Sequence, residues 1–179
     1  MSHDPVKMMV IGVGALGKHH ARILSEMPGV RLVAVADSRR DVGEAVAAAC
    51  RTGWVPDYAK CLDHVDAVSI VVPTAGHQEV ANKCLERGVD ALIEKPLAAT
   101  IAEGRRIVEA ASRQDAVLQV GHIERFNPAF IELQRLTGYD RTMVYRFDAD
   151  WHGEIIAERT IDQPLRYLGQ HFPATDIPA

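Results

Sequence analysis

A glycine-rich turn after an apolar run constrains this chain more than any other feature. Residues 8–11 are apolar, and Gly12, Gly14 and Gly17 follow with the spacing G-x-G-x-x-G. In such a turn the first glycine permits a tight exit from a strand, the second lets a pyrophosphate approach the backbone, and the third lets the next helix pack closely. The phosphates lie at the helix N-terminus, where N–H groups and the helix dipole favour negative charge. The pattern therefore predicts a strand, a phosphate-binding turn and a helix over residues 15–27.

A second apolar run supports a dinucleotide site. Residues 32–36 are apolar and end at Asp37, about 20 residues after Gly17, where a dinucleotide-binding fold places the acid that hydrogen-bonds the ribose 2′-OH. Arg39 and Arg40 follow closely and are able to hold the 2′-phosphate of NADP instead. We expect NAD as the cofactor and leave NADP open. The alternative is a βαβ turn that only needs small residues, with Asp37 as a helix cap.

Composition narrows the function classes. The 179 residues are 47% hydrophobic and 25% charged, with a formal net charge of −4, which suits a soluble globular protein and argues against nucleic acid or an anionic membrane as partner. The apolar runs are too short to span a membrane, and the N-terminus lacks a signal pattern, so we expect a cytoplasmic location. The cysteines Cys50, Cys61 and Cys84 form no C-x-x-C and predict reduced thiols, and the scattered histidines predict no metal site.

Strand-like and helix-like segments alternate over most of the chain. Apolar segments at 54–55, 67–72, 91–93 and 117–120 are separated by helical segments at 39–51, 77–87 and 100–114. This alternation predicts an α/β fold, a Rossmann-type doubly wound parallel sheet. Ser38 and Thr100 are the expected caps of the helices that follow them. Ligand sites in such sheets lie at the carboxyl ends of the strands, where the sequence places Asp37, Thr74, His77, Glu94, Lys95 and His122.

These motifs, taken in order, resemble those of the Gfo/Idh/MocA oxidoreductases, which are NAD(P)-dependent dehydrogenases of sugars, inositols and related polyols. The resemblance covers residues 6–134 and rests on G-V-G-A-L-G, V-A-D-S-R, V-V-P-T-A-G-H and E-K-P-L-A. Residues 120–128 are similar to the branch that oxidises nucleotide-activated sugars such as UDP-N-acetylglucosamine. The resemblance implies cofactor contacts by Gly12, Gly14, Ala15, Leu16, Gly17, Asp37, Ser38, Arg39, Pro73, Thr74, His77, Glu94 and Lys95. It implies contacts to a sugar or nucleotide-sugar substrate by Lys95, His122, Arg125 and Asn127.

Lys95 is the candidate catalytic residue on this resemblance. It would lie near the nicotinamide and the sugar hydroxyl, where a lysine can orient the hydroxyl or take part in proton transfer; the alternative is an exposed lysine before a turn. Glu94 either contacts the cofactor or pairs with Lys95, and His77 either lines the cleft or is a chemically silent helix residue. The family also has a second domain and a later histidine motif that this sequence does not show. We therefore expect a domain incomplete as a catalyst, and we leave a homo-oligomer open.

The last part of the chain resembles a different family, the phytochrome GAF domain. Residues 136–148, 151–158 and 173–178 carry this resemblance, and the last segment is similar to the bilin-contacting motif P-x-S-D-I-P. Segments 142–147 and 154–157 are predicted to form a hairpin. We expect a nucleotide-binding domain over 1–134 and an incomplete GAF-like segment over 135–179, joined in a helix at 128–137. No cysteine follows Cys84, so we expect no covalent bilin. The alternative functions are a fragment of a bilin-binding photosensory module and a non-catalytic NAD-binding remnant.

Overall fold

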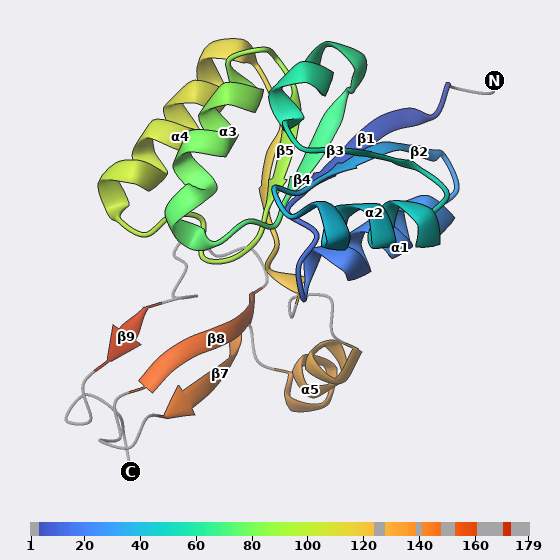
Figure 1. Ribbon diagram of the computed structural model, residues 1–179. Coiled ribbons are helices and arrows are strands. Elements are labelled where there is room, and N and C mark those ends of the chain that lie inside the picture. The colour runs from blue at the N-terminus through green and yellow to red at the C-terminus, as the bar shows by residue number, and fades with distance from the viewer. Residues whose placement is uncertain (1–3, 124–127, 139–140, 148–152, 161–169, 173–179) are drawn as a thin grey trace. The chain divides into compact units, whose positions relative to one another are not determined.

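The computed structural model describes residues 4–123, 128–138, 141–147, 153–160 and 170–172 (Figure 1). Contacts divide the chain into two compact units, Met1–Gly121 and His122–Ala179. The domain boundary expected near residue 134 is defined by sequence, as the point where the first family resemblance ends and the second begins. The division by contacts does not test that boundary, so it stays a prediction. Each unit is described by itself below.

The first unit is built on a six-stranded parallel sheet with the order β3-β2-β1-β4-β5-β6. Its strands are β1 Val6–Ile11, β2 Val30–Ala36, β3 Gly53–Val55, β4 Ala67–Ile70, β5 Asp90–Ile93 and β6 Leu118–Val120. Strand β1 pairs with both β2 and β4, so the strand order reverses beside it. A doubly wound sheet has its ligand crevice at such a reversal. The predicted Rossmann-type parallel sheet is confirmed.

Helices cover both faces of this sheet, with α1 and α2 on one side and α3 and α4 on the other (Figure 1). They are α1 Gly17–Glu26, α2 Arg40–Ala49, α3 His77–Leu85 and α4 Ile101–Gln114, with short 3₁₀ helices η1 Tyr58–His64 and η2 Thr74–Gly76. Strand β1 is buried on both faces: Met9 and Ile11 pack in the core beneath α3 and α4, whereas Val10 packs in the core beneath α1 and α2. This two-sided burial explains why the strands read as continuous apolar runs.

The helix starts follow local chemistry. Thr100 and Glu103 form a capping box: the Thr100 hydroxyl accepts from the Glu103 N–H at 3.2 Å, and the Glu103 carboxylate accepts from the Thr100 N–H at 3.0 Å. The expectation that Ser38 caps α2 is wrong. Arg39 is the N-cap residue and makes no side-chain capping hydrogen bond, while its N–H donates to the Asp37 carboxylate at 2.9 Å.

The second unit contains helix α5 Pro128–Thr137 and a three-stranded antiparallel sheet, β7-β8-β9. The strands are β7 Arg141–Phe147, β8 Gly153–Thr160 and β9 His171–Phe172. The predicted helix and hairpin are confirmed, and the short β9 was not predicted. Residues 151–152 and 173–178, which carry part of the phytochrome resemblance, lie outside the described residues. Within the part of the chain that the structure describes, no helix has the length and apolar character needed to cross a membrane.

Candidate functional site: a cleft at the strand ends

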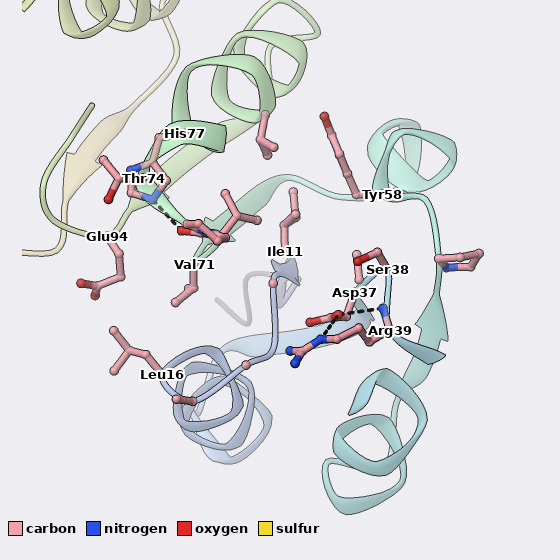
Figure 2. A pocket seen from close by; sticks show the side chains of 18 of the residues that line it. Ile11, Leu16, Asp37, Ser38, Arg39, Tyr58, Val71, Thr74, His77 and Glu94 are labelled. Atoms are coloured by element: carbon pink, nitrogen blue, oxygen red, sulfur yellow. Dashed lines mark hydrogen bonds and ion pairs between the residues drawn. The ribbon is translucent and has the colours of Figure 1, made fainter. Parts of the chain in front are cut away.

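A cleft of about 730 Å³ opens at the carboxyl ends of the central strands of the first unit. Figure 2 shows Asp37, Ser38 and Arg39 on one side of it and Thr74, His77 and Glu94 on the other. Every predicted cofactor residue except Gly17 lines this cleft. Its walls are Ile11, Gly12, Gly14, Ala15, Leu16, Ala36, Asp37, Ser38, Arg39, Pro56, Tyr58, Val71, Val72, Pro73, Thr74, His77, Val80, Glu94 and Lys95.

The three glycines of the turn serve different purposes. Gly12 has φ +85°, a conformation that favours glycine, and a Cβ there would lie 2.8 Å from the Val71 carbonyl oxygen. A Cβ on Gly17 would overlap the Gly12 carbonyl, so α1 packs against the turn through this missing side chain. A Cβ on Gly14 would meet only the Arg39 guanidinium at 3.5 Å, an ordinary contact. The fold therefore requires Gly12 and Gly17, whereas Gly14 leaves room beside the cleft.

The N-terminus of α1 faces the cleft and carries no side-chain cap. Its N-cap residue, Leu16, supplies no side-chain hydrogen bond, and the first turn contains no acidic residue. The first N–H groups of a helix have no partner within the helix, and the dipole places partial positive charge there. With Gly14, Ala15 and Leu16 lining the cleft, the backbone offers an anion-binding surface.

Asp37 ends β2 with its carboxylate held in a fixed direction. Oδ2 accepts from the Val13 N–H at 3.0 Å, and Oδ1 accepts from the Arg39 N–H at 2.9 Å and from the Arg39 guanidinium at 3.4 Å. Burial acts to raise the pKa of Asp37, but the hydrogen bonds from Arg39 and Val13 and the Arg39 charge outweigh it and lower that pKa below its ordinary value. The side chain is only 8% exposed. The cleft thus contains an ionised, oriented hydrogen-bond acceptor.

The two arginines after Asp37 have different surroundings. Arg39 lines the cleft, whereas Arg40 pairs with Glu44 at 2.9 Å and lies 5.8 Å over the ring of Trp54. The Trp54 indole in turn donates to the Asp37 carbonyl at 3.0 Å. Arg39 is therefore the arginine placed to meet a ligand at this end of the cleft.

His77 has a structural position although it lines the cleft. It is 1% exposed; Nε2 lies 2.9 Å from the Val72 carbonyl, and Nδ1 lies 2.9 Å from the Pro96 carbonyl. The ring therefore ties the segment after β4 to the segment after β5. Of the two interpretations of His77, the contacts favour the structural one. They place its ring nitrogens on the backbone, while Thr74 remains beside it at the wall of the cleft (Figure 2).

Glu94 and Lys95 form the wall of the cleft after β5. Glu94 is 8% exposed, and its Oε2 accepts from the backbone N–H of Lys95 at 3.2 Å. Lys95 is exposed, and its peptide bond to Pro96 is cis. The Glu94 carboxylate contacts His20 and not the Lys95 ammonium among the ion pairs of the described residues. Sequence reasoning missed His20, because the histidines were assessed only as possible metal ligands.

The predicted substrate residues are less well placed. His122 is half-buried and belongs to the second unit, whereas Arg125 and Asn127 lie outside the described residues. Lys95 lines the cleft. Across the described ranges, no group of His, Cys, Asp and Glu side chains is arranged to hold a metal ion.

Residues 6–122 match the model of the Gfo/Idh/MocA group, described as an oxidoreductase family with an NAD-binding Rossmann fold. The chain belongs to this family. Inositol 2-dehydrogenase 1 of Saccharopolyspora erythraea is 36% identical over 180 aligned residues, covering 97% of this chain and 50% of that protein. UDP-N-acetylglucosamine 3-dehydrogenase of Acidithiobacillus ferrooxidans is 38% identical over 130 residues, covering 73% of this chain and 41% of that protein. The chain spans about half the length of these relatives or less.

A solved structure with the same fold contains a bound cofactor. GenD2 from gentamicin A biosynthesis, in complex with NAD, has a TM-score of 0.73 and 27% identity, with 84% of this chain and 47% of that chain covered. A separate similarity links this chain to phytochrome B of Sorghum bicolor, which is 46% identical over 83 residues, or 46% of this chain and 7% of that protein. This second match covers less than half of the chain, so a GAF identity for the last segment stays a prediction.

Proposed function

We propose that the first unit binds NAD in the cleft and forms the nucleotide-binding part of a dehydrogenase that acts on a sugar or nucleotide-sugar hydroxyl. The observation that carries this proposal is the Asp37 carboxylate, which is ionised, oriented by two backbone N–H groups and placed in the cleft wall. It lies beside an open glycine turn at the positive end of α1. A dinucleotide needs this combination of an acceptor for a ribose hydroxyl and backbone donors for a pyrophosphate.

The cleft walls fit the parts of the cofactor in sequence. Asp37 takes the adenosine ribose, the turn at Gly14 and Leu16 takes the pyrophosphate, and the nicotinamide half extends toward Glu94 and Lys95. The negative charge of Asp37 favours NAD over NADP, because a 2′-phosphate would meet a carboxylate at this place. Arg39, which shares that carboxylate at 3.4 Å, is the residue able to reduce the repulsion.

Lys95 is the proposed catalytic residue of the first unit. NAD, when bound, supplies the hydride acceptor for the carbon that carries the reacting hydroxyl. Lys95 lines the cleft beyond Glu94, where its Nζ can orient the hydroxyl and hold or pass on its proton. Relatives named as dehydrogenases of inositol and of UDP-N-acetylglucosamine support cyclic polyols and nucleotide sugars as the substrate class. Because the chain spans half of those proteins, we propose that this unit alone turns such substrates over slowly or not at all.

The glycine turn provides the sharpest test of cofactor binding. Gly14→Val puts a side chain where the pyrophosphate would lie, and the single ordinary contact of its Cβ predicts that the fold survives. Calorimetric titration with NAD should show binding by the wild-type chain and none by Gly14→Val. Gly53→Val is a matched control, since a Cβ there lies 4.0 Å from its nearest neighbour and Gly53 does not line the cleft, and it should bind like the wild type. Unchanged NAD affinity in a folded Gly14→Val protein would refute the proposed function.

A further inference from the structure

A hydrogen-bonded chain of three side chains runs from the sheet core to the cleft. The Ser69 hydroxyl on β4 lies 2.9 Å from His20 Nδ1, and His20 Nε2 lies 3.2 Å from Glu94 Oε1. Ser69 is fully buried, and the side chains of His20 and Glu94 are 16% and 10% exposed. A carboxylate removed from water to this extent needs hydrogen-bond donors. In Glu94 they are His20 on Oε1 and the Lys95 N–H on Oε2.

The donor and acceptor properties of these groups fix their roles. An ionised carboxylate only accepts, so His20 Nε2 carries a proton and donates it to Glu94. In a neutral imidazole the other nitrogen, Nδ1, is then an acceptor, and the Ser69 hydroxyl is free to donate to it. The Glu94 carboxylate therefore selects the His20 tautomer, the Ser69 hydroxyl partners the other ring nitrogen, and neither His20 nor Ser69 lines the cleft itself.

Glu94 is also confined from its other side. A Cβ on Gly121 would lie 2.6 Å from Glu94 Oε1 and 3.1 Å from its carboxyl carbon. The Gly121 N–H donates to the Ile93 carbonyl at 2.8 Å, which fixes this glycine next to the end of β5. The carboxylate is therefore held between an imidazole and a glycine, with its direction set by both.

We infer that His20 is a positioning residue that fixes the Glu94 carboxylate for the nicotinamide riboside half of the cofactor. This inference rests on the proposed function. Glu94 and Asp37 line the cleft from opposite sides (Figure 2), so if Asp37 binds the adenosine ribose, Glu94 faces the other half. That half carries ribose hydroxyls and a carboxamide N–H₂ group, which are donors that a fixed carboxylate accepts.

Comparison of two ligands separates this role from a general effect on the fold. NADH contains the nicotinamide riboside, whereas ADP contains only the adenosine and the pyrophosphate. His20→Ala should weaken NADH binding about tenfold, the scale of a hydrogen bond to a charged group, and change ADP binding less than about twofold. Because Gln places an N–H donor at the same ε position, His20→Gln should recover most of the NADH affinity. His19→Ala, at the exposed neighbouring position of α1, should change neither ligand.

A second variant guards against a His20→Ala protein that fails to fold. Gly121→Ala pushes Glu94 from the opposite side and should also weaken NADH more than ADP. Equal loss of both ligands in either folded variant would overturn the inference, as would unchanged NADH binding in His20→Ala or a His20→Gln protein as weak as His20→Ala. If the wild-type chain binds ADP but not NADH, the inference fails; if it binds neither, the proposed function fails with it.

Discussion

Asp37 receives three hydrogen bonds and holds a lowered pKa, so its charge persists through the neutral pH range. We predict that Asp37→Ala lowers NAD affinity by about 2 kcal/mol, the scale of a hydrogen bond to a charged group, and raises NADP affinity. Titration of both cofactors measures the change in their ratio. Arg40→Ala is the control, because Arg40 pairs with Glu44 away from the cleft walls. A ratio that does not move in Asp37→Ala would mean that Asp37 serves only the turn.

The sign of the pH dependence follows from the same contacts. A carboxyl with a lowered pKa stays ionised above its ordinary value of 3.8 and gains its proton only as the pH falls below that value. The contribution of Asp37 to NAD affinity, measured as the difference between the wild type and Asp37→Ala, should therefore stay constant between pH 8 and about pH 5.

Cys84 differs from the other two thiols in reactivity. Burial raises its pKa to about 12, against a smaller opposing effect of Arg87, and the residue is fully buried. Because the thiolate is the reactive form, we predict that a thiol reagent at pH 8 modifies Cys50 and Cys61, both half-buried, well before Cys84. Mass spectrometry of the labelled peptides measures the order, and Cys84 should react once the protein is unfolded in urea. Labelling of native Cys84 as fast as Cys61 would contradict this burial.

At the scale of an element, helix α4 depends on its start. The capping box satisfies N–H groups at Thr100 and Glu103, so Thr100→Ala should lower the free energy of unfolding by about 1 kcal/mol. Ser112→Ala is a matched control on the same helix, since its hydroxyl only donates back to the Val108 carbonyl, a contact that adds little to a helix. Urea unfolding of both variants measures the difference. Equal stability of Thr100→Ala and the wild type would show that the capping box does not hold the helix.

The elements that the sequence predicted best carry strong local signals. Strands buried on both faces appear as apolar runs, and Gly88, with φ +72°, ends the turn after α3 as expected. Helix η1 was missed because a 3₁₀ segment has no hydrophobic period to detect. Ser38 was wrongly expected to cap α2, because the helix begins at Arg40, one residue later than the sequence pattern indicated.

The residues of the candidate site likewise fall into those that the sequence indicates and those that only the structure reveals. The glycine turn and Asp37 have a fixed spacing along the chain, so the sequence alone is enough to propose them as cofactor residues. The contact between His20 and Ser69 joins residues separated by 49 positions, and no sequence pattern encodes it. The two interpretations of His77 could not be separated for the same reason, because its carbonyl partners at Val72 and Pro96 come from different strand ends.

At the scale of the whole molecule, the described residues that line the cleft all lie between Ile11 and Lys95. We predict that truncation after Thr137 changes NAD affinity less than about twofold, a difference of roughly 0.4 kcal/mol. Calorimetry on the full and truncated chains measures this, with Gly14→Val in the truncated chain as the negative control. Loss of NAD binding on truncation would mean that the last segment contributes to the site.

The different surroundings of the three glycines also bear on how this chain changes over generations. Every other amino acid has a Cβ, so position 17 admits no replacement and position 12 almost none while the fold is under selection. Position 14 is free to drift once binding no longer matters, because a side chain there meets only one ordinary contact. A related protein that is no longer selected for ligand binding would keep Gly12 and Gly17 and would lose Gly14 first. Selection for folding alone would not preserve a glycine at position 14, and this chain has one there.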